Sequence, residues 1–390
     1  MLTSLGLILI FGYLLGLVFQ KINLPSLLGM LITGIIVGPF ALNLLDENIL
    51  LISADLRKFA LIIILLRAGL ALDLKDLKQV GRPAVLLCFV PALLEIAAIV
   101  IVAPLLFDIS YLDAGIMGAV VAAVSPAVVV PRMLKLMKDG YGKYKNIPQL
   151  IMAGASVDDI FVIIIFFTLM RIALGGSVTT FDFFKAPLSI LLGAAFGVLI
   201  GYLLSYLFKR FHIRDSSKII ILLSISILLV ALESITESYL PFSALLGAMF
   251  VGMTILKQIP ELAGRLSSKL SKLWIAAEII LFVLVGAAVD LSVLKIVSVF
   301  AVLLLACSLT ARMLGVAISV SGSHLNKKER LFCMVAYTPK ATVQAAIGTI
   351  PLAAGLASGN IILSVAVLSI IITAPIGALL IDTLKKNLHH

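Results

Sequence analysis

The chain has 390 residues, of which 62% are hydrophobic and 13% charged, and its formal net charge is +10. A soluble chain of this length could not bury so much apolar surface, so the composition indicates a membrane protein whose main partner is the lipid bilayer. In such a chain the excess of Lys and Arg is expected to report topology, and nucleic-acid binding is not expected.

Thirteen stretches are apolar enough to be membrane-spanning helices. Each needs roughly 20 residues to cross about 30 Å of hydrocarbon. Continuous apolar runs such as Leu61–Leu66 favour helices over a barrel, whose strands alternate apolar and polar residues. The first stretch has no basic leader and no small-residue cleavage pattern, so we expect a retained helix and not a signal peptide. The predicted spans are 3–19, 26–43, 58–72, 84–107, 112–131, 148–174, 186–208, 217–235, 243–256, 272–289, 293–320, 330–352 and 360–383.

The basic residues are distributed unevenly between the loops that join these spans. With the N-terminus outside, 22 of the 30 Lys and Arg residues fall on the inner side, as the positive-inside rule requires. We therefore predict an outer N-terminus and a cytoplasmic C-terminus. The expected location is the inner membrane of a bacterial cell, because no targeting extension is evident, and an organellar membrane is the alternative. The inner-side residues are Lys21, Lys75, Lys78, Arg82, Arg132, Lys135, Lys138, Lys143, Lys145, Lys209, Arg210, Arg214, Lys218, Lys257, Arg265, Lys269, Lys272, Lys327, Lys328, Arg330, Lys385 and Lys386.

Several residue types suggest no chemistry. Cys88, Cys307 and Cys333 are scattered through apolar spans, which suits packing better than disulfides or metal ligands. The terminal His389 and His390 fit a purification-tag remnant as well as native sequence. A stripe of small residues, Gly193, Gly197 and Gly201, is interpreted as a surface for close helix packing.

Two prolines predict broken helices at matched places. Ser125-Pro126 lies inside span 112–131 and Thr338-Pro339 inside span 330–352, where proline removes a helical hydrogen bond. Alone, either would be interpreted as a packing kink. The two spans are seven apart, an odd offset that reverses direction through the bilayer, so together they predict an inverted repeat with the binding site at the midplane.

Charged side chains within the bilayer cost roughly 2.5–3.5 kcal/mol each on the insertion scale, so they need partners or a function. Glu95 and Arg312 have opposite charge on repeat-related spans, and we predict an ion pair between them. Lys340 follows Pro339 directly, where its ammonium group could compensate helix-end carbonyls or a nearby acid. The five ionisable residues well inside the spans are Glu95, Asp158, Asp159, Arg312 and Lys340.

Asp158 and Asp159 are adjacent on a predicted helix, where they point about 100° apart and can border one cavity. Carboxylates, together with hydroxyl or backbone oxygens near Ser125 and Thr338, are suitable ligands for a hard monovalent cation. Because desolvation penalises a charged carboxylate, a buried aspartate is neutralised by either a proton or a cation. This competition predicts exchange of protons for sodium or lithium. The alternative is that one acid only pairs with Arg312 or Lys340.

Four segments occur in the order found in a known family: Leu66–Leu70, Ala123–Pro131, Gly154–Ile160 and Pro339–Gly348. Over nearly its whole length the chain resembles the monovalent cation:proton antiporter superfamily, in its sodium/hydrogen exchanger-like branch. The resemblance implies an inverted-repeat antiporter fold with two crossing broken helices, and a transporter rather than an enzyme. No cofactor is expected beyond the transported sodium or lithium ion.

The resemblance also implies roles for segments and residues. A core of residues 84–174 and 292–390 would move against a dimerising scaffold of 1–83 and 216–291, joined by a linker, 175–215, in an elevator-like cycle. Asp159 would be the main ion and proton site and Asp158 would assist. Glu95 and Arg312 would form the core ion pair, and the Ser125 and Thr338 regions the crossing breaks. Many relatives have Thr-Asp-Pro where this chain has Val124-Ser125-Pro126, and others have lysine at position 312, which bears on proton stoichiometry.

Other functions are weighed against this one. A sodium-coupled symporter of an organic anion could use a related inverted-repeat fold, and its acids would not have to titrate. An intramembrane aspartyl protease needs two acids on separate helices facing one water, which the adjacent Asp158 and Asp159 disfavour. A channel or purely structural role leaves the matched broken helices unexplained.

Overall fold

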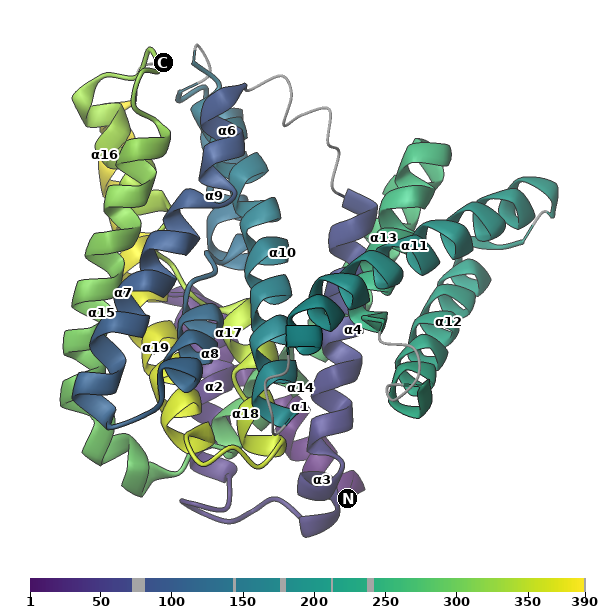
Figure 1. Ribbon diagram of the computed structural model, residues 1–390, viewed down its shortest axis with the longest axis horizontal. Helices are drawn as coiled ribbons and strands as arrows, with labels where there is room; N and C mark the ends of the chain where they lie inside the picture. The colour runs from purple at the N-terminus through teal and green to yellow at the C-terminus, as the bar shows by residue number, and fades with distance from the viewer. Residues whose placement is uncertain (72–80, 143–144, 176–179, 212, 237–241, 389–390) are drawn as a thin grey trace. The chain divides into compact units, whose positions relative to one another are not determined.

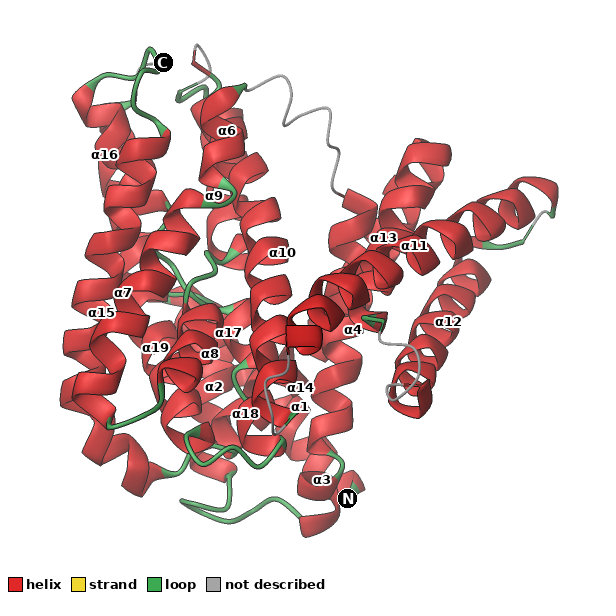
Figure 2. Cartoon of the chain, viewed as in Figure 1, coloured by secondary structure: helices red, strands yellow, loops and turns green. Residues whose placement is uncertain are grey.

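The computed structural model describes residues 1–71, 81–142, 145–175, 180–211, 213–236 and 242–388, without the side chains of residues 156, 160, 180–187 and 190. These ranges consist of helices and loops and contain no strand (Figure 2). Helices are expected here because lipid offers no hydrogen bonds to an exposed backbone. The predicted all-α membrane fold is confirmed. Lys75, Lys78, Lys143, His389 and His390, named above, lie outside the described ranges.

Contacts divide the chain into two compact units. The first unit comprises Met1–Leu51, Lys75–Ala173 and Phe282–His390. Its helices are α1 (Leu2–Lys21), α2 (Ser26–Val37), α3 (Glu47–Leu51), α6 (Arg82–Leu87), α7 (Val90–Phe107), α8 (Tyr111–Val121), α9 (Pro126–Lys138), α10 (Ile147–Leu174), α15 (Leu291–Ser319), α16 (Lys327–Ala336), α17 (Thr342–Ile347), α18 (Ile350–Ala353), α19 (Gly359–Leu384) and the short η2 (Lys385–Asn387).

The second unit comprises Ile52–Leu74 and Leu174–Leu281. It contains α4 (Ser53–Ala71), α11 (Thr180–Arg210), α12 (Asp215–Thr236), α13 (Ala244–Gln258) and most of α14 (Pro260–Ala287). Small residues let its helices approach closely, since a Cβ added to Gly197 of α11 would meet the backbone of Gly247 in α13. One added to Gly193 would meet the backbone of Ser243, the N-cap residue of α13. At Gly201 it would meet the side chain of Thr254. The predicted packing role of this stripe is confirmed.

Each of the thirteen predicted spans overlaps a helix. Within the described residues nine helices are long and apolar enough to cross a membrane, with three shorter apolar helices besides. The largest difference is at α14, which begins at Pro260, whereas the prediction starts at residue 272. The prediction places the basic residues Arg265, Lys269 and Lys272 on the inner side, in a loop before the span. Lys and Arg are good helix formers, so the helix continues through them.

The broken helices occur where the two prolines predict them. α8 ends at Val121 and α9 begins at Pro126, while α16 ends at Ala336 and α17 begins at Thr342. Proline cannot donate a helical hydrogen bond and disfavours a helical conformation in the preceding residue. The breaks touch each other, because the Ser125 amide donates to the Pro339 carbonyl at 2.8 Å. Two crossing broken helices are thereby confirmed.

The helices around this crossing bring distant parts of the sequence together. α7 packs along α15 and against α8, and α15 also contacts α16 and α19 (Figure 1). Gly315 on α15 allows the close approach to α7, since a Cβ there would lie 2.6 Å from the Cα of Pro91. One turn before this contact, α15 carries Arg312 into the interior of the first unit.

Candidate functional site: a buried charge cluster at the helix crossing

The first unit contains a cluster of charged residues from four parts of the fold. Glu95 comes from α7, Asp158 from α10, Arg312 from α15, and Lys340 from the break between α16 and α17. All four side chains are fully buried. Ionised groups persist at such depth only when opposite charges and hydrogen bonds compensate their desolvation.

Arg312 is the centre of this cluster. Its Nη1 lies 2.8 Å from Glu95 Oε2 and its Nη2 lies 2.7 Å from Asp158 Oδ2. The guanidinium group also donates to two backbone carbonyls, from Nε to Tyr337 at 2.6 Å and from Nη1 to Ala122. The planar, five-donor geometry of arginine permits this, and a lysine could not reproduce it.

The two carbonyls belong to the helix breaks. Ala122 is the C-cap residue of α8 and Tyr337 is the C-cap residue of α16. The last carbonyls of a helix have no intrahelical partner and carry the negative end of the helix dipole. Arg312 therefore satisfies the C-terminal ends of both broken helices with one side chain, in addition to pairing with two acids.

Lys340 is the second cation that compensates the charge of Glu95. Its Nζ lies 2.6 Å from Glu95 Oε2, the oxygen that Arg312 also contacts. Its backbone amide donates to Thr373 Oγ1 at 2.8 Å, which fixes the broken segment against α19. Of the two partners considered in the sequence for this lysine, the structure shows the acid.

The two aspartates have different surroundings. Asp158 Oδ2 accepts from Arg312 and from the Val124 amide at 2.9 Å, so the first acid is paired. Asp159 is partly accessible, and its buried Oδ1 has no hydrogen-bond partner in the described ranges. No ion pair to Asp159 occurs within them either. The two cations, Arg312 and Lys340, therefore balance the charges of Glu95 and Asp158. Asp159 is a third acid without a cation of its own.

Hydroxyl groups near the breaks also differ. Ser125 Oγ is buried and lacks a partner among the described residues. Thr338 Oγ1 donates to the Val335 carbonyl at 2.8 Å, so its proton is engaged although its lone pairs can still accept or ligate. Thr342 Oγ1, which the sequence did not single out, is likewise buried without a partner in those ranges.

Gln344 is a residue of the crossing that the sequence analysis missed as a site residue. Its Nε2 donates to the carbonyls of Val121 and Ala123, at 3.0 and 2.8 Å, and its Oε1 accepts from the Ala341 amide at 2.8 Å. One buried amide thus holds both breaks together. An amide within a predicted span was the available signal, but its partners could not be identified.

No group of three or more His, Cys, Asp and Glu side chains able to hold a metal is found in the part of the chain that the structure describes. The crossing does contain oxygen atoms without a hydrogen-bond partner among the described residues. They are Asp159 Oδ1, Asp158 Oδ1 and Ser125 Oγ. Such ligands suit a proton or a hard monovalent cation in transit.

Comparisons with known proteins agree with the fold. Residues 6–385 match the family model described as "Sodium/hydrogen exchanger, transmembrane". The chain is 35% identical to human sodium/hydrogen exchanger 9B2, covering 98% of this chain and 74% of that protein. It is 30% identical to human sodium/hydrogen exchanger 9B1, covering 94% and 72%.

A solved structure has the same fold. The sodium proton antiporter MjNhaP1 from Methanocaldococcus jannaschii superposes with a TM-score of 0.81, covering 99% of this chain and 97% of that one, at 20% identity. The relatives found by sequence are named as exchangers, which are transporters and not enzymes. The family match over almost the whole length leads to one conclusion: this chain belongs to the sodium/hydrogen exchanger family.

Proposed function

We propose that this protein exchanges protons for sodium or lithium across a membrane, with Asp159 as the principal binding site and Asp158 as an assisting ligand. The observation that carries the proposal is the unmatched acid: of Glu95, Asp158 and Asp159, only Asp159 has no ion pair among the described residues. The names of the relatives, sodium/hydrogen exchanger and sodium proton antiporter, support sodium and protons as the exchanged ions.

Competition at one carboxylate is sufficient for coupled exchange. A buried aspartate is costly while charged, so it is neutralised by a proton or by a cation. If the protein changes conformation only when Asp159 is neutralised, each crossing carries one ion type or the other. The unpartnered oxygens of Asp158 and Ser125 would complete the coordination of the cation, with Thr338 as a further ligand.

The proposed cycle is elevator-like. Core segments 84–174 and 292–390 would move against a dimerising scaffold of 1–83 and 216–291, with 175–215 as the linker. The charge cluster and both helix breaks belong to one compact unit that includes most of both core segments, which supports their moving together. That unit also includes residues 1–51, so the boundary of the moving part has to be tested.

Alternating access can be measured with a thiol at the crossing. A Ser125→Cys variant in a Cys307→Ala background should react with a membrane-impermeant thiol reagent applied from either side of oriented vesicles, because Cys88 and Cys333 are buried. Reaction from one side only, whatever the sodium gradient, would contradict the cycle. Native mass spectrometry of the same preparation would report the proposed homodimer.

We also propose an outer N-terminus and a cytoplasmic C-terminus, on the distribution of the basic residues. The bacterial inner membrane expected from the sequence has no support in the comparisons, since the relatives found by sequence are animal proteins. Protease protection of an epitope placed at either end would test the orientation. Because thirteen spans place the two ends on opposite sides, the two epitopes should be protected from protease applied on opposite sides, and protection of both from the same side would contradict the proposal.

The transport test is a cation-triggered pH change in proteoliposomes, with sodium, lithium and potassium added separately. The wild type should move protons when sodium or lithium is added, and Asp159→Asn should not. Asp55→Asn is the matched control, because Asp55 is exposed on α4, outside the cluster. If reconstituted wild-type protein moves no protons with any cation, the antiport proposal fails and sodium-coupled uptake of an organic anion becomes the next hypothesis.

A further inference from the structure

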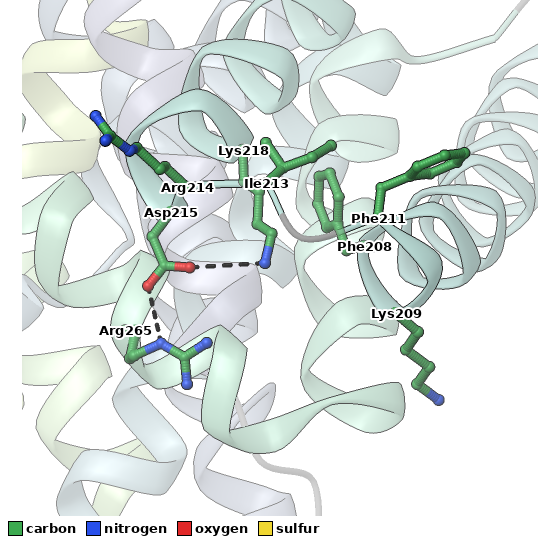
Figure 3. A pocket seen from close by; sticks show the side chains of 8 residues that line it. All are labelled: Phe208, Lys209, Phe211, Ile213, Arg214, Asp215, Lys218 and Arg265. Carbon is green, nitrogen blue, oxygen red and sulfur yellow. Dashed lines mark hydrogen bonds and ion pairs between the residues drawn. The ribbon is translucent and has the colours of Figure 1, made fainter.

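The second unit contains a hollow that the transport proposal does not use. It lies where α11 ends, α12 begins and the early turns of α14 pass, and its volume is about 320 Å³ (Figure 3). Every residue around it belongs to the second unit. The lining residues are Phe208, Lys209, Phe211, Ile213, Arg214, Asp215, Lys218 and Arg265.

Two of the cations lining the hollow are held in place by its one acid. Arg265 Nε lies 2.8 Å from Asp215 Oδ2, and Lys218 Nζ lies 3.7 Å from Asp215 Oδ1 (Figure 3). Lys218 is only 7% exposed, and its ammonium group also lies 5.5 Å from the centroid of the Phe208 ring. This arrangement fixes two positive charges at the wall of the hollow.

The other two cations are not neutralised. Lys209 and Arg214 are exposed, and neither side chain has an ion pair or hydrogen bond to any residue that the structure describes. Figure 3 shows both side chains extending away from Asp215. Four positive charges therefore surround one negative charge, and two of the four are free to contact an anion.

The hollow lies where a membrane-spanning segment meets water. The apolar part of α11 ends at Arg210, and that of α12 begins at Asp215. Large apolar side chains beside it are exposed: Tyr206 is 58%, Phe211 52% and Ile220 64% accessible. In a membrane protein such side chains face acyl chains, so basic groups here lie at the level of lipid headgroups.

We propose that this basic hollow binds the phosphate of an anionic lipid headgroup. Lys209, Arg214 and Lys218 would contact the phosphate oxygens, and the exposed faces of α11 and α12 would accommodate the acyl chains. A soluble phosphate would use the same charges but would gain nothing from the adjoining apolar surface. That surface is why the proposal commits to a lipid.

The test uses the full chain in dodecyl maltoside, titrated with dioleoylphosphatidylglycerol, dioleoylphosphatidylcholine or inorganic phosphate. Lipid retention is measured by native mass spectrometry and stabilisation by the unfolding temperature. The variant is Lys209→Gln with Arg214→Gln, which breaks no contact that the structure shows. The matched control is Lys327→Gln with Lys328→Gln, which removes the same charge from an exposed turn of α16.

Phosphatidylglycerol should bind and stabilise the wild type and the control, while the Lys209/Arg214 variant should bind it roughly 10- to 30-fold more weakly. Each basic residue near an anionic headgroup contributes a factor of about five. Phosphatidylcholine and inorganic phosphate should have little effect. Equal phosphatidylglycerol affinity in variant and control would overturn the proposal. Binding of inorganic phosphate as strong as that of the lipid would also overturn it, in favour of a soluble-anion site.

Discussion

Arg312 and Asp158 form a buried ion pair, with Nη2 and Oδ2 2.7 Å apart, while the adjacent Asp159 has a buried oxygen without a partner in the described ranges. The two neighbouring acids therefore have different tasks available to them. Asp158 is part of the charge balance that holds the crossing together, and Asp159 is the acid that we propose to exchange a proton for a cation.

The two aspartates should differ in their effect on stability. Asp158→Asn leaves Arg312 with less compensation and should destabilise the protein by about 3 kcal/mol, as expected for a broken buried pair. Asp159→Asn removes an unpaired acid and should leave stability unchanged or raise it. Both should lose transport. Unfolding temperature, followed through the single tryptophan, Trp274, separates them. Equal destabilisation by both changes would contradict the assignment of the pair to Asp158.

Arg312 should not be replaceable by lysine without loss. Arg312→Lys keeps the charge for Glu95 and Asp158 but cannot also donate to the carbonyls of Ala122 and Tyr337. Leaving such buried carbonyls without a donor costs about 1–3 kcal/mol each. We expect a lower unfolding temperature and slower proton movement in proteoliposomes.

Lys58→Arg, an exposed change of the opposite sense, serves as the control for expression and reconstitution. Wild-type stability in Arg312→Lys would mean that charge alone is sufficient and that capping of the breaks contributes nothing.

Gln344 should be needed to hold the crossing although it carries no charge. Gln344→Met has a similar volume but leaves the carbonyls of Val121 and Ala123 and the amide of Ala341 without their partner. A loss of about 2 kcal/mol or more in stability is expected, together with reduced transport. Gln20→Met on an exposed face of α1 is the matched control. If the two variants unfold at the same temperature, the amide is not a structural link.

Asp290 gives a pH-dependent prediction outside the spans. Its carboxylate caps α15 and accepts from the Ser292 hydroxyl at 2.6 Å and the Ser292 amide at 2.8 Å, which lowers the pKa of Asp290 below its ordinary value. A lowered folded-state pKa gives stability that is present above the unfolded pKa of about 4 and lost as pH falls through the folded value.

Asp290→Ala should therefore be less stable than wild type at pH 7, and the difference should shrink as the pH is lowered below about 4. Asp290→Asn keeps a capping oxygen and should be less destabilised than Asp290→Ala at pH 7. Parallel stability curves for wild type and Asp290→Ala across this range would contradict the role of the ionised cap.

Local properties of the sequence were sufficient to predict most of the fold. Apolar length identifies membrane helices, and a proline removes a helical hydrogen bond, so the breaks after Val121 and Ala336 could be anticipated. Proline alone does not decide this, because α7, α9 and α19 continue past Pro104, Pro131 and Pro375. The exception is α14, which starts at Pro260 and not near residue 272. Charged residues mark the edge of a membrane span, but they do not end a helix.

The sequence by itself determined that this is a helical membrane protein of the exchanger family, with two broken helices and five ionisable residues within its spans. The sequence also predicted the pair of Glu95 and Arg312, which the structure shows. Only the tertiary structure decided the complete set of pairings. In the structure Arg312 forms ion pairs with Asp158 and Glu95, and Lys340 forms one with Glu95. Asp159 has no ion pair among the described residues. These contacts join residues more than 150 positions apart. No local pattern can specify them, because they depend on how whole helices pack.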